Sequence, residues 1–160
     1  MSFPKMLGLA ELAVESERFR ATGRKLVLTN GCFDLLHVGH VRYLQAARRR
    51  GDALVVALNG DDSVRALKGP SRPVNTELDR AEVLAALACV DFVTVFHSAR
   101  VTEVIRAIRP QIYVKGGDYT LDSLDPGERE ALEDVGAQIE ILELVAGKST
   151  TAILQKISTP

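Results

Sequence analysis

The sequence lacks long apolar runs: nothing in its 160 residues approaches the ~20 apolar residues that a membrane-spanning helix needs. It also lacks the apolar segment of a secretory signal peptide near residue 1, where charged residues appear by Lys5 and recur from Glu11. Only two cysteines are present, Cys32 and Cys89, too few for a disulfide framework. These shortages predict a protein of the reducing cytoplasm that does not insert into membranes.

An excess of charge of one sign is lacking as well. The formal net charge is -1 at pH 7, so no global field would draw the chain to nucleic acid or to anionic membranes. An anionic ligand would therefore have to be held locally. Histidine is scarce, with three in the chain, and cysteine and histidine do not cluster as they do in a zinc site. We predict no metal ion held by protein side chains.

What the sequence does contain is an alternation of short apolar runs with helical patterns. The predicted strands are residues 25–29, 53–58, 92–96, 112–114 and 138–144, and the predicted helices are 9–20, 39–50, 64–67, 76–88, 99–108, 126–135 and one that begins in 147–151 and runs through 157. This order predicts an α/β fold, a Rossmann-like, doubly wound, five-stranded parallel sheet with helices on both faces. We expect a single domain over residues 1–160, with a lead-in helix within 1–23 and the core in 24–157.

One stretch organises the rest, residues 26–40, in which an apolar strand turns at Asn30-Gly31 and enters a helix. It delivers His37 and His40 with Gly39 between them. Gly39 lets a ligand approach the backbone, and a helix N-terminus offers unpaired N–H groups and partial positive charge. The two imidazoles would add hydrogen-bond donors. This layout predicts a phosphate site.

A second phosphate element follows the last strand, at Gly147-Lys-Ser-Thr-Thr151. Ser149 is a good N-cap, Thr150 and Thr151 offer hydroxyl groups in the first helical turn, and Lys148 adds a positive charge. A helix that is merely well capped would look similar, so this element is weak by itself.

The stretch Cys32-Phe-Asp-Leu-Leu-His-Val-Gly-His40 resembles the nucleotidyltransferase superfamily that is marked by two histidines around a variable residue and a glycine. The Ser-Thr-Thr sequence near the C-terminus matches a second motif of the same superfamily. The resemblance implies a nucleoside triphosphate held between two helix N-termini, with Mg²⁺ delivered by the triphosphate. The expected catalytic residues are His37, His40 and Lys68, and the expected nucleotide-binding residues are Gly31, Cys32, Phe33, Gly39, Arg80, Gly116, Asp118, Lys148, Ser149, Thr150 and Thr151.

Two cations, Lys68 and Arg72, lie in a stretch of turn-forming residues that could close over the site. We interpret them as clamps for the β- and γ-phosphates or for the phosphate of a second substrate, and a solvated basic loop is the alternative. The expected residues for the second substrate are Asp34, Asn59 and Arg72. Arg80 lies one position from an apolar helix stripe, and the resemblance implies that it points into the site.

Nearly the whole chain from Arg24 to Ile157 is similar to the adenylyltransferases of bacterial heptose activation. The residues that carry this similarity are 28–34, 64–75, 113–119 and 147–151. The similarity implies the reaction of ATP with D-glycero-β-D-manno-heptose 1-phosphate to give ADP-heptose and pyrophosphate, for the inner core of lipopolysaccharide. No kinase domain fits in this chain, so the heptose phosphate would come from separate enzymes. A homodimer or higher homo-oligomer is also expected by resemblance.

Three alternatives remain open at this point. A cytidylyltransferase acting on glycerol 3-phosphate or a related phospho-alcohol would carry an arginine ahead of Ser-Thr-Thr, and residues 144–147 lack one. A non-catalytic nucleotide-binding module could use the same fold. An enzyme that uses Cys32 as its nucleophile is the third, although a turn residue beside the site is the simpler interpretation of Cys32.

Overall fold

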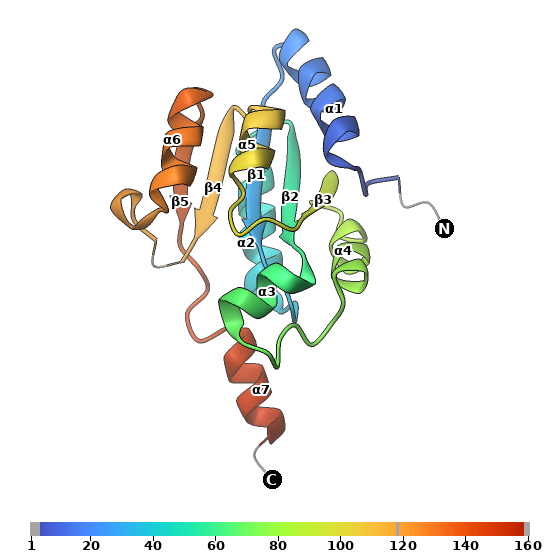
Figure 1. Ribbon diagram of the computed structural model, residues 1–160, viewed down its shortest axis with the longest axis vertical. Helices are drawn as coiled ribbons and strands as arrows, with labels where there is room; N and C mark the ends of the chain where they lie inside the picture. Colours follow the sequence, from blue (N-terminus) through green and yellow to red (C-terminus); the bar gives the residue numbers. More distant parts are fainter. Residues whose placement is uncertain (1–3, 118, 159–160) are drawn as a thin grey trace.

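A computed structural model gives the structure of the chain and describes residues 4–117 and 119–158. Its sheet has five parallel strands in the order β3 (Phe92–Phe96), β2 (Ala53–Asn59), β1 (Leu26–Gly31), β4 (Ile112–Gly116) and β5 (Gln138–Leu142) (Figure 1). The prediction of a doubly wound parallel sheet is confirmed. In the described part of the chain, no helix is both long and apolar enough to cross a bilayer.

Helices cover both faces of the sheet, and each face has its own apolar core. They are α1 (Leu9–Ala21), α2 (Val38–Arg48), α3 (Asp61–Lys68), α4 (Glu77–Ala85), α5 (Thr102–Ile108), α6 (Pro126–Asp134) and α7 (Thr150–Ser158), with a short 3-10 turn, η1 (Leu121–Ser123). One core joins α1, α5 and α6 to the side chains of Leu28, Val55 and Tyr113. The other joins α2 and α4 to the side chains that alternate with these, such as Val27 and Val56.

The central strand β1 is where the winding reverses. It pairs with β2 along its whole length, and with β4 through Val27 and Leu28 on its other edge. Ligands of such sheets bind beyond the carboxyl ends of the strands at this reversal. The ends of β1 and β4 therefore share one rim, and the segment that carries His37 and His40 starts from it.

Several element boundaries differ from the prediction for local reasons. Helix α3 begins at Asp61 rather than at residue 64, because Gly60 is extended and the Glu77 carboxylate accepts a hydrogen bond from Asp61 N at 2.8 Å. Helix α5 begins at Thr102 rather than at residue 99, whereas α7 begins at Thr150, within the predicted 147–151, after Gly147 takes a φ of +72°. The turn η1, and a short segment around Met6 that pairs with Val93 beside β3, were not predicted.

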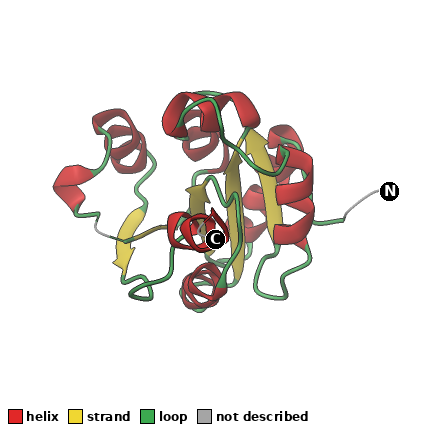
Figure 2. Cartoon of the chain, turned by 90° about the horizontal axis from the view of Figure 1, so that it is seen from below, coloured by secondary structure: helices red, strands yellow, loops and turns green. Residues whose placement is uncertain are grey.

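Helix α7 projects beyond the rim at the carboxyl ends of the strands (Figure 1). A view from below sees it nearly end-on, in front of the sheet (Figure 2). None of its residues is buried. Its partly buried side chains are those of Thr150 and residues 152–154, in its first half.

Candidate active site

A cleft of about 1170 Å³ opens at the carboxyl ends of the strands. Most of the site residues that the sequence predicts line this cleft. They are Gly31, Cys32, Phe33, Asp34, His37, Gly39, His40, Asn59, Lys68, Arg72, Gly116, Lys148, Ser149, Thr150 and Thr151. Arg80 does not line the cleft, and Asp118 lies outside the described residues.

The turn after β1 fixes the histidines through an aromatic contact. Phe33 has a left-handed backbone, with φ +43°, and its ring packs edge-on against His40 with the ring centroids 5.4 Å apart. A side chain at Gly31 would meet this ring, since an added Cβ would lie 2.9 Å from Phe33 Cε2. The turn therefore needs a glycine on one side of the phenylalanine ring and leaves His40 against the other.

His37 and His40 form a stacked pair at the start of α2, with ring centroids 3.9 Å apart. His37 is the N-cap residue of α2, and its Nδ1 accepts a hydrogen bond from Gly39 N at 3.1 Å. Because Nδ1 is an acceptor, the neutral His37 ring carries its proton on Nε2 and can donate it to a ligand. His40 Nδ1 is buried without a hydrogen-bond partner among the described residues.

Both imidazoles are held neutral at physiological pH. Burial, and then the neighbouring His37, lower the pKa of His40 to about 4. Burial, and then the positive charge of Lys148, lower the pKa of His37 below its usual value. The pair can thus offer N–H donors without bringing positive charge of its own into the cleft.

Helix α7 meets the start of α2 at Gly39. A Cβ added there would lie 2.8 Å from His37 Cε1 and 3.2 Å from Lys148 Cβ. Ser149 Oγ accepts a hydrogen bond from Ala152 N and so caps α7, as predicted, while Thr150 Oγ1 donates to Leu35 O at 3.2 Å. Two helix N-termini therefore face one cleft, and this arrangement favours anions.

The expected clamps, Lys68 and Arg72, differ in their surroundings. Lys68 is exposed at the end of α3 and has no carboxylate partner among the described residues, so its charge is available. Arg72 Nε lies 2.8 Å from Asp34 Oδ2, and the Asp34 carboxylate also accepts hydrogen bonds from the backbone N–H of Val74 and Asn75. Asp34 thus ties the 69–75 loop to the turn that carries the histidines, and Arg72 lines the cleft while its Nε faces Asp34.

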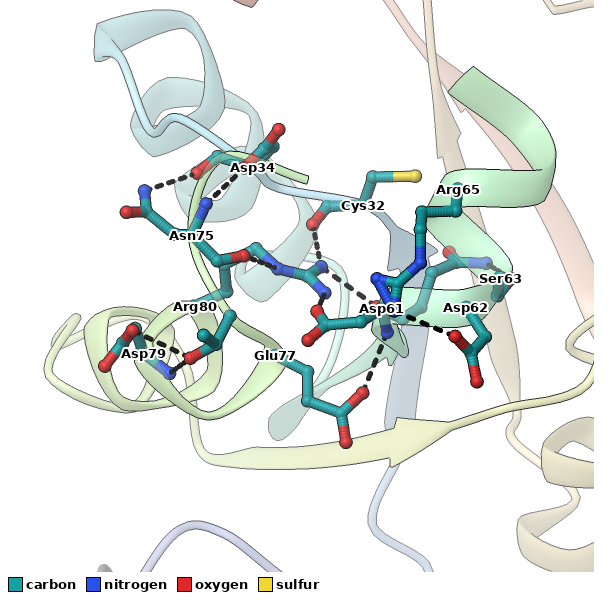
Figure 3. Close-up of polar contacts among 12 residues, drawn as sticks. Cys32, Asp34, Asp61, Asp62, Ser63, Arg65, Asn75, Glu77, Asp79 and Arg80 are labelled. Carbon is teal, nitrogen blue, oxygen red and sulfur yellow. Dashed lines mark hydrogen bonds and ion pairs between the residues drawn. The ribbon is translucent and has the colours of Figure 1, made fainter. Parts of the chain in front are cut away.

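Arg80 corrects an expectation. Its side chain is 1% exposed, and its guanidinium is used by the protein itself (Figure 3). It donates to the backbone oxygens of Asn75, Cys32 and Asn59, and it pairs with Asp61 at 2.8 Å. A guanidinium buried among four acceptors holds structure together, so Arg80 supports the cleft from beneath and does not point into it.

Asn59, which lies at the end of β2, is nearly buried. Its side-chain amide donates to Ser63 Oγ at 2.9 Å, and its backbone carbonyl oxygen accepts a hydrogen bond from Arg80. Asn59 also lines the cleft, as expected.

Cys32 also lines the cleft, but its chemistry does not favour a nucleophile. Burial raises the pKa of the Cys32 thiol, and this outweighs the opposing effect of the nearby Lys68 and Arg80 charges. A catalytic cysteine needs its thiolate. The environment of Cys32 therefore fits a turn residue.

The residues on one side of the cleft were not predicted from the sequence. Asn30 and Lys115, at the ends of β1 and β4, line it together with Glu128 in the first turn of α6. Lys115 lies two residues after the buried Tyr113 on β4 and therefore points to the same face of the sheet, and that spacing was the available signal for its direction. Across the described residues, no group of three or more His, Cys, Asp or Glu side chains is placed to hold a metal ion.

Comparisons with known proteins agree with this geometry. A family model described as cytidylyltransferase-like matches residues 28–158. The Bifunctional protein HldE of Syntrophotalea carbinolica is 53% identical over 144 residues, which are 90% of this chain and 29% of the relative. The protein of the same name from Geotalea uraniireducens is 50% identical over 155 residues, 97% of this chain and 31% of the relative. The chain thus spans less than a third of the length of these relatives.

A solved structure with a similar fold is the crystal structure of the lipopolysaccharide core biosynthesis protein from Thermoplasma volcanium GSS1. It superposes with a TM-score of 0.62 at 27% identity and covers 77% of this chain and 98% of that one.

Gly39→Ala tests the contact between the two helix starts. The substitution favours helix formation, but the new methyl group must displace the His37 ring or Lys148. We expect the protein to stay folded while turnover falls about 100-fold, since a shift of ~1 Å in a positioned group costs that much. Gly8→Ala is the matched control, because its added Cβ would lie 3.5 Å from the nearest atom. Equal turnover in the two variants would contradict the role of this contact in positioning the site.

The neutral state of His40 predicts a pH dependence of stability. Below pH ~6.5 His40 is protonated in the unfolded chain, whereas in the folded chain it stays neutral until about pH 4. The free energy of unfolding therefore decreases as the pH falls through this window. Relative to His40→Asn, wild-type protein should lose about 1–2 kcal/mol between pH 7 and pH 4.5, after a discount for partial exposure. Urea unfolding at a series of pH values measures this. A difference that stays constant with pH would show that His40 titrates normally.

Proposed function

The chain belongs to the cytidylyltransferase-like family and is a nucleotidyltransferase, and from that premise we propose that it transfers AMP from ATP to D-glycero-β-D-manno-heptose 1-phosphate. The products are ADP-heptose and pyrophosphate. The observation that carries the proposal is the meeting of the α2 and α7 N-termini at Gly39, beside two neutral histidines. A triphosphate is the ligand that such a pair of helix starts suits best.

The proposed reaction is a single in-line displacement. An oxygen of the sugar 1-phosphate attacks the α-phosphorus of ATP, a new P–O bond forms, and the bond from that phosphorus to the oxygen bridging the α- and β-phosphates breaks. The electron pair leaves with pyrophosphate. The attacking oxygen is already anionic near neutral pH, so no general base is required and no covalent enzyme intermediate forms.

In this proposal the protein contributes position and electrostatic stabilisation. His37 Nε2–H, the His40 ring and the unpaired backbone N–H groups at the two helix starts surround the α-phosphate. Donors fixed before the reaction are worth ~10²–10³ in rate each, because they need no reorganisation as charge builds on the phosphate oxygens. Hydrogen bonds from the neutral rings would become stronger as negative charge develops on the α-phosphate oxygens.

Cationic groups at the rim would handle the remaining phosphates. Lys68, which has no carboxylate partner among the described residues, is placed to attract the departing pyrophosphate or the phosphate of the second substrate. Arg72, whose Nε faces Asp34, would join it through its terminal guanidinium nitrogens. Lys148 adds charge at the start of α7. Mg²⁺ would enter as part of the ATP complex, bound by phosphate oxygens and water.

The choice of heptose rests on similarity. The relatives at about 50% identity bear the name Bifunctional protein HldE, and the similar solved structure is a lipopolysaccharide core biosynthesis protein. These names fit the resemblance of residues 64–75 and 113–119 to the heptose adenylyltransferases. We also propose that residues 24–157 form one catalytic unit, that the protein acts in the cytoplasm, and that it associates as a homodimer or larger homo-oligomer.

Pyrophosphate release tests the substrates directly. ATP and CTP are each paired with heptose 1-phosphate and with glycerol 3-phosphate, and kcat/KM is measured for the four pairs. We expect ATP with heptose 1-phosphate to exceed every other pair by at least about 100-fold, because a site built for particular polar groups rejects ligands that lack them.

Activity confined to CTP and glycerol 3-phosphate would replace this proposal with the cytidylyltransferase alternative. Nucleotide binding without turnover of any pair would favour the non-catalytic module.

A further inference from the structure

The cleft extends past the histidines to the side of the sheet that α5 and α6 cover, and the mechanism above uses nothing there. Asn30, Lys115 and Glu128 line this part. Asn30 directly precedes Gly31 and the histidine turn, so a ligand beside it lies next to the reacting phosphate. The region is therefore placed to hold the remainder of the molecule whose phosphate attacks ATP.

A hydrogen-bond network fixes Asn30. Its side-chain oxygen accepts from the hydroxyl group of the fully buried Tyr113 at 2.6 Å and from Lys115 Nζ at 3.2 Å. Two donors on that oxygen set the orientation of the amide. Its N–H groups have no partner among the described residues, so they remain available to a ligand.

Glu128 supplies the complementary acceptor. The residue is 6% exposed, and its carboxylate accepts a long hydrogen bond from Val101 N at 3.5 Å. A buried carboxylate has room for several short hydrogen bonds, and leaving them unmade is costly. Its place in the first turn of α6, where negative charge is favoured, explains how the fold tolerates it.

Lys115 balances that charge. Burial lowers the pKa of its ammonium group, and the nearby Glu128 carboxylate is the largest opposing influence, which raises it. The ammonium also lies 4.9 Å from the centre of the Tyr119 ring. Neither Lys115 nor Glu128 has an ion-pair partner within 4 Å among the described residues, so both keep hydrogen-bonding capacity for a polar ligand.

We propose that Asn30, Lys115 and Glu128 form the subsite for the sugar ring of the second substrate. Ring hydroxyl groups donate to the Glu128 carboxylate and accept from the Asn30 amide and the Lys115 ammonium. This inference rests on the proposed sugar nucleotidyl transfer and adds where the sugar binds and which groups read it.

The subsite also accounts for selectivity. A phospho-alcohol with few hydroxyl groups would leave the buried Glu128 carboxylate and the Lys115 ammonium without partners. Unpaired buried polar groups are what lets a site reject an analogue that lacks a hydroxyl group, by up to ~10⁴-fold. The subsite therefore favours polyhydroxylated sugar 1-phosphates over glycerol 3-phosphate.

Glu128→Gln tests the subsite, because it keeps the shape of the side chain and removes its charge. We expect KM for heptose 1-phosphate to rise at least about 10-fold while KM for ATP stays within about 2-fold, since the lost hydrogen bonds are to the sugar alone. Glu130→Gln, an exposed residue of the same helix, is the matched control. Lys115→Gln is the second variant, with the same expectation, and thermal unfolding verifies that each protein is folded.

The outcomes separate this inference from the proposed function. Wild-type turnover of heptose 1-phosphate with an unchanged sugar KM in both variants overturns the subsite alone. A rise in KM for ATP rather than for the sugar also overturns it, because the residues would then belong to the nucleotide. If the wild-type protein instead uses another sugar 1-phosphate, and that KM rises in both variants, the subsite stands and the heptose assignment fails. Preference for glycerol 3-phosphate overturns both.

Discussion

The close approach of α7 to α2 at Gly39 is the contact on which the site depends. A Cβ at residue 39 would lie 3.2 Å from Cβ of Lys148, which directly precedes α7, so the two helix starts come into close contact there. Helix α7 has no fully buried residues, and the hydrogen bond from Thr150 to Leu35 joins it to the same turn. Partial positive charge from two helices is thereby concentrated on one phosphate-sized region.

Beneath that contact, charged side chains form the hydrogen bonds that hold the rim together. Arg80 joins the turn at Cys32, the end of β2 at Asn59 and the loop at Asn75, and Asp34 joins the same loop to the histidine turn. A buried guanidinium is costly unless every donor finds an acceptor, and its removal would strand several carbonyl oxygens together with Asp61. The network thus joins the turn that carries the histidines to the 69–75 loop.

The parts of the fold and site that local sequence determines could be predicted. Apolar runs placed all five strands, and the strand–turn–helix pattern around His37 and His40 placed both histidines at the rim. Arg80 could not be placed, because its acceptors come from three separate segments whose convergence no spacing reveals. Glu128 reads in the sequence as an ordinary acidic residue in a first helical turn, and only the fold brings its carboxylate near enough to Lys115 to counteract the effect of burial, which lowers the pKa of that lysine.

The central claim is that two neutral histidines stabilise the α-phosphate as charge develops on it. Such an interaction is stronger in the transition state than in the bound substrate, so its loss affects rate more than binding. Single-turnover rates and ATP dissociation constants of His37→Ala and His40→Ala test this most directly. The account predicts rates reduced by at least about 100-fold in each variant, with ATP affinity within about 3-fold of wild type. Equal losses of rate and affinity would contradict it, because the histidines would then serve only to bind the nucleotide.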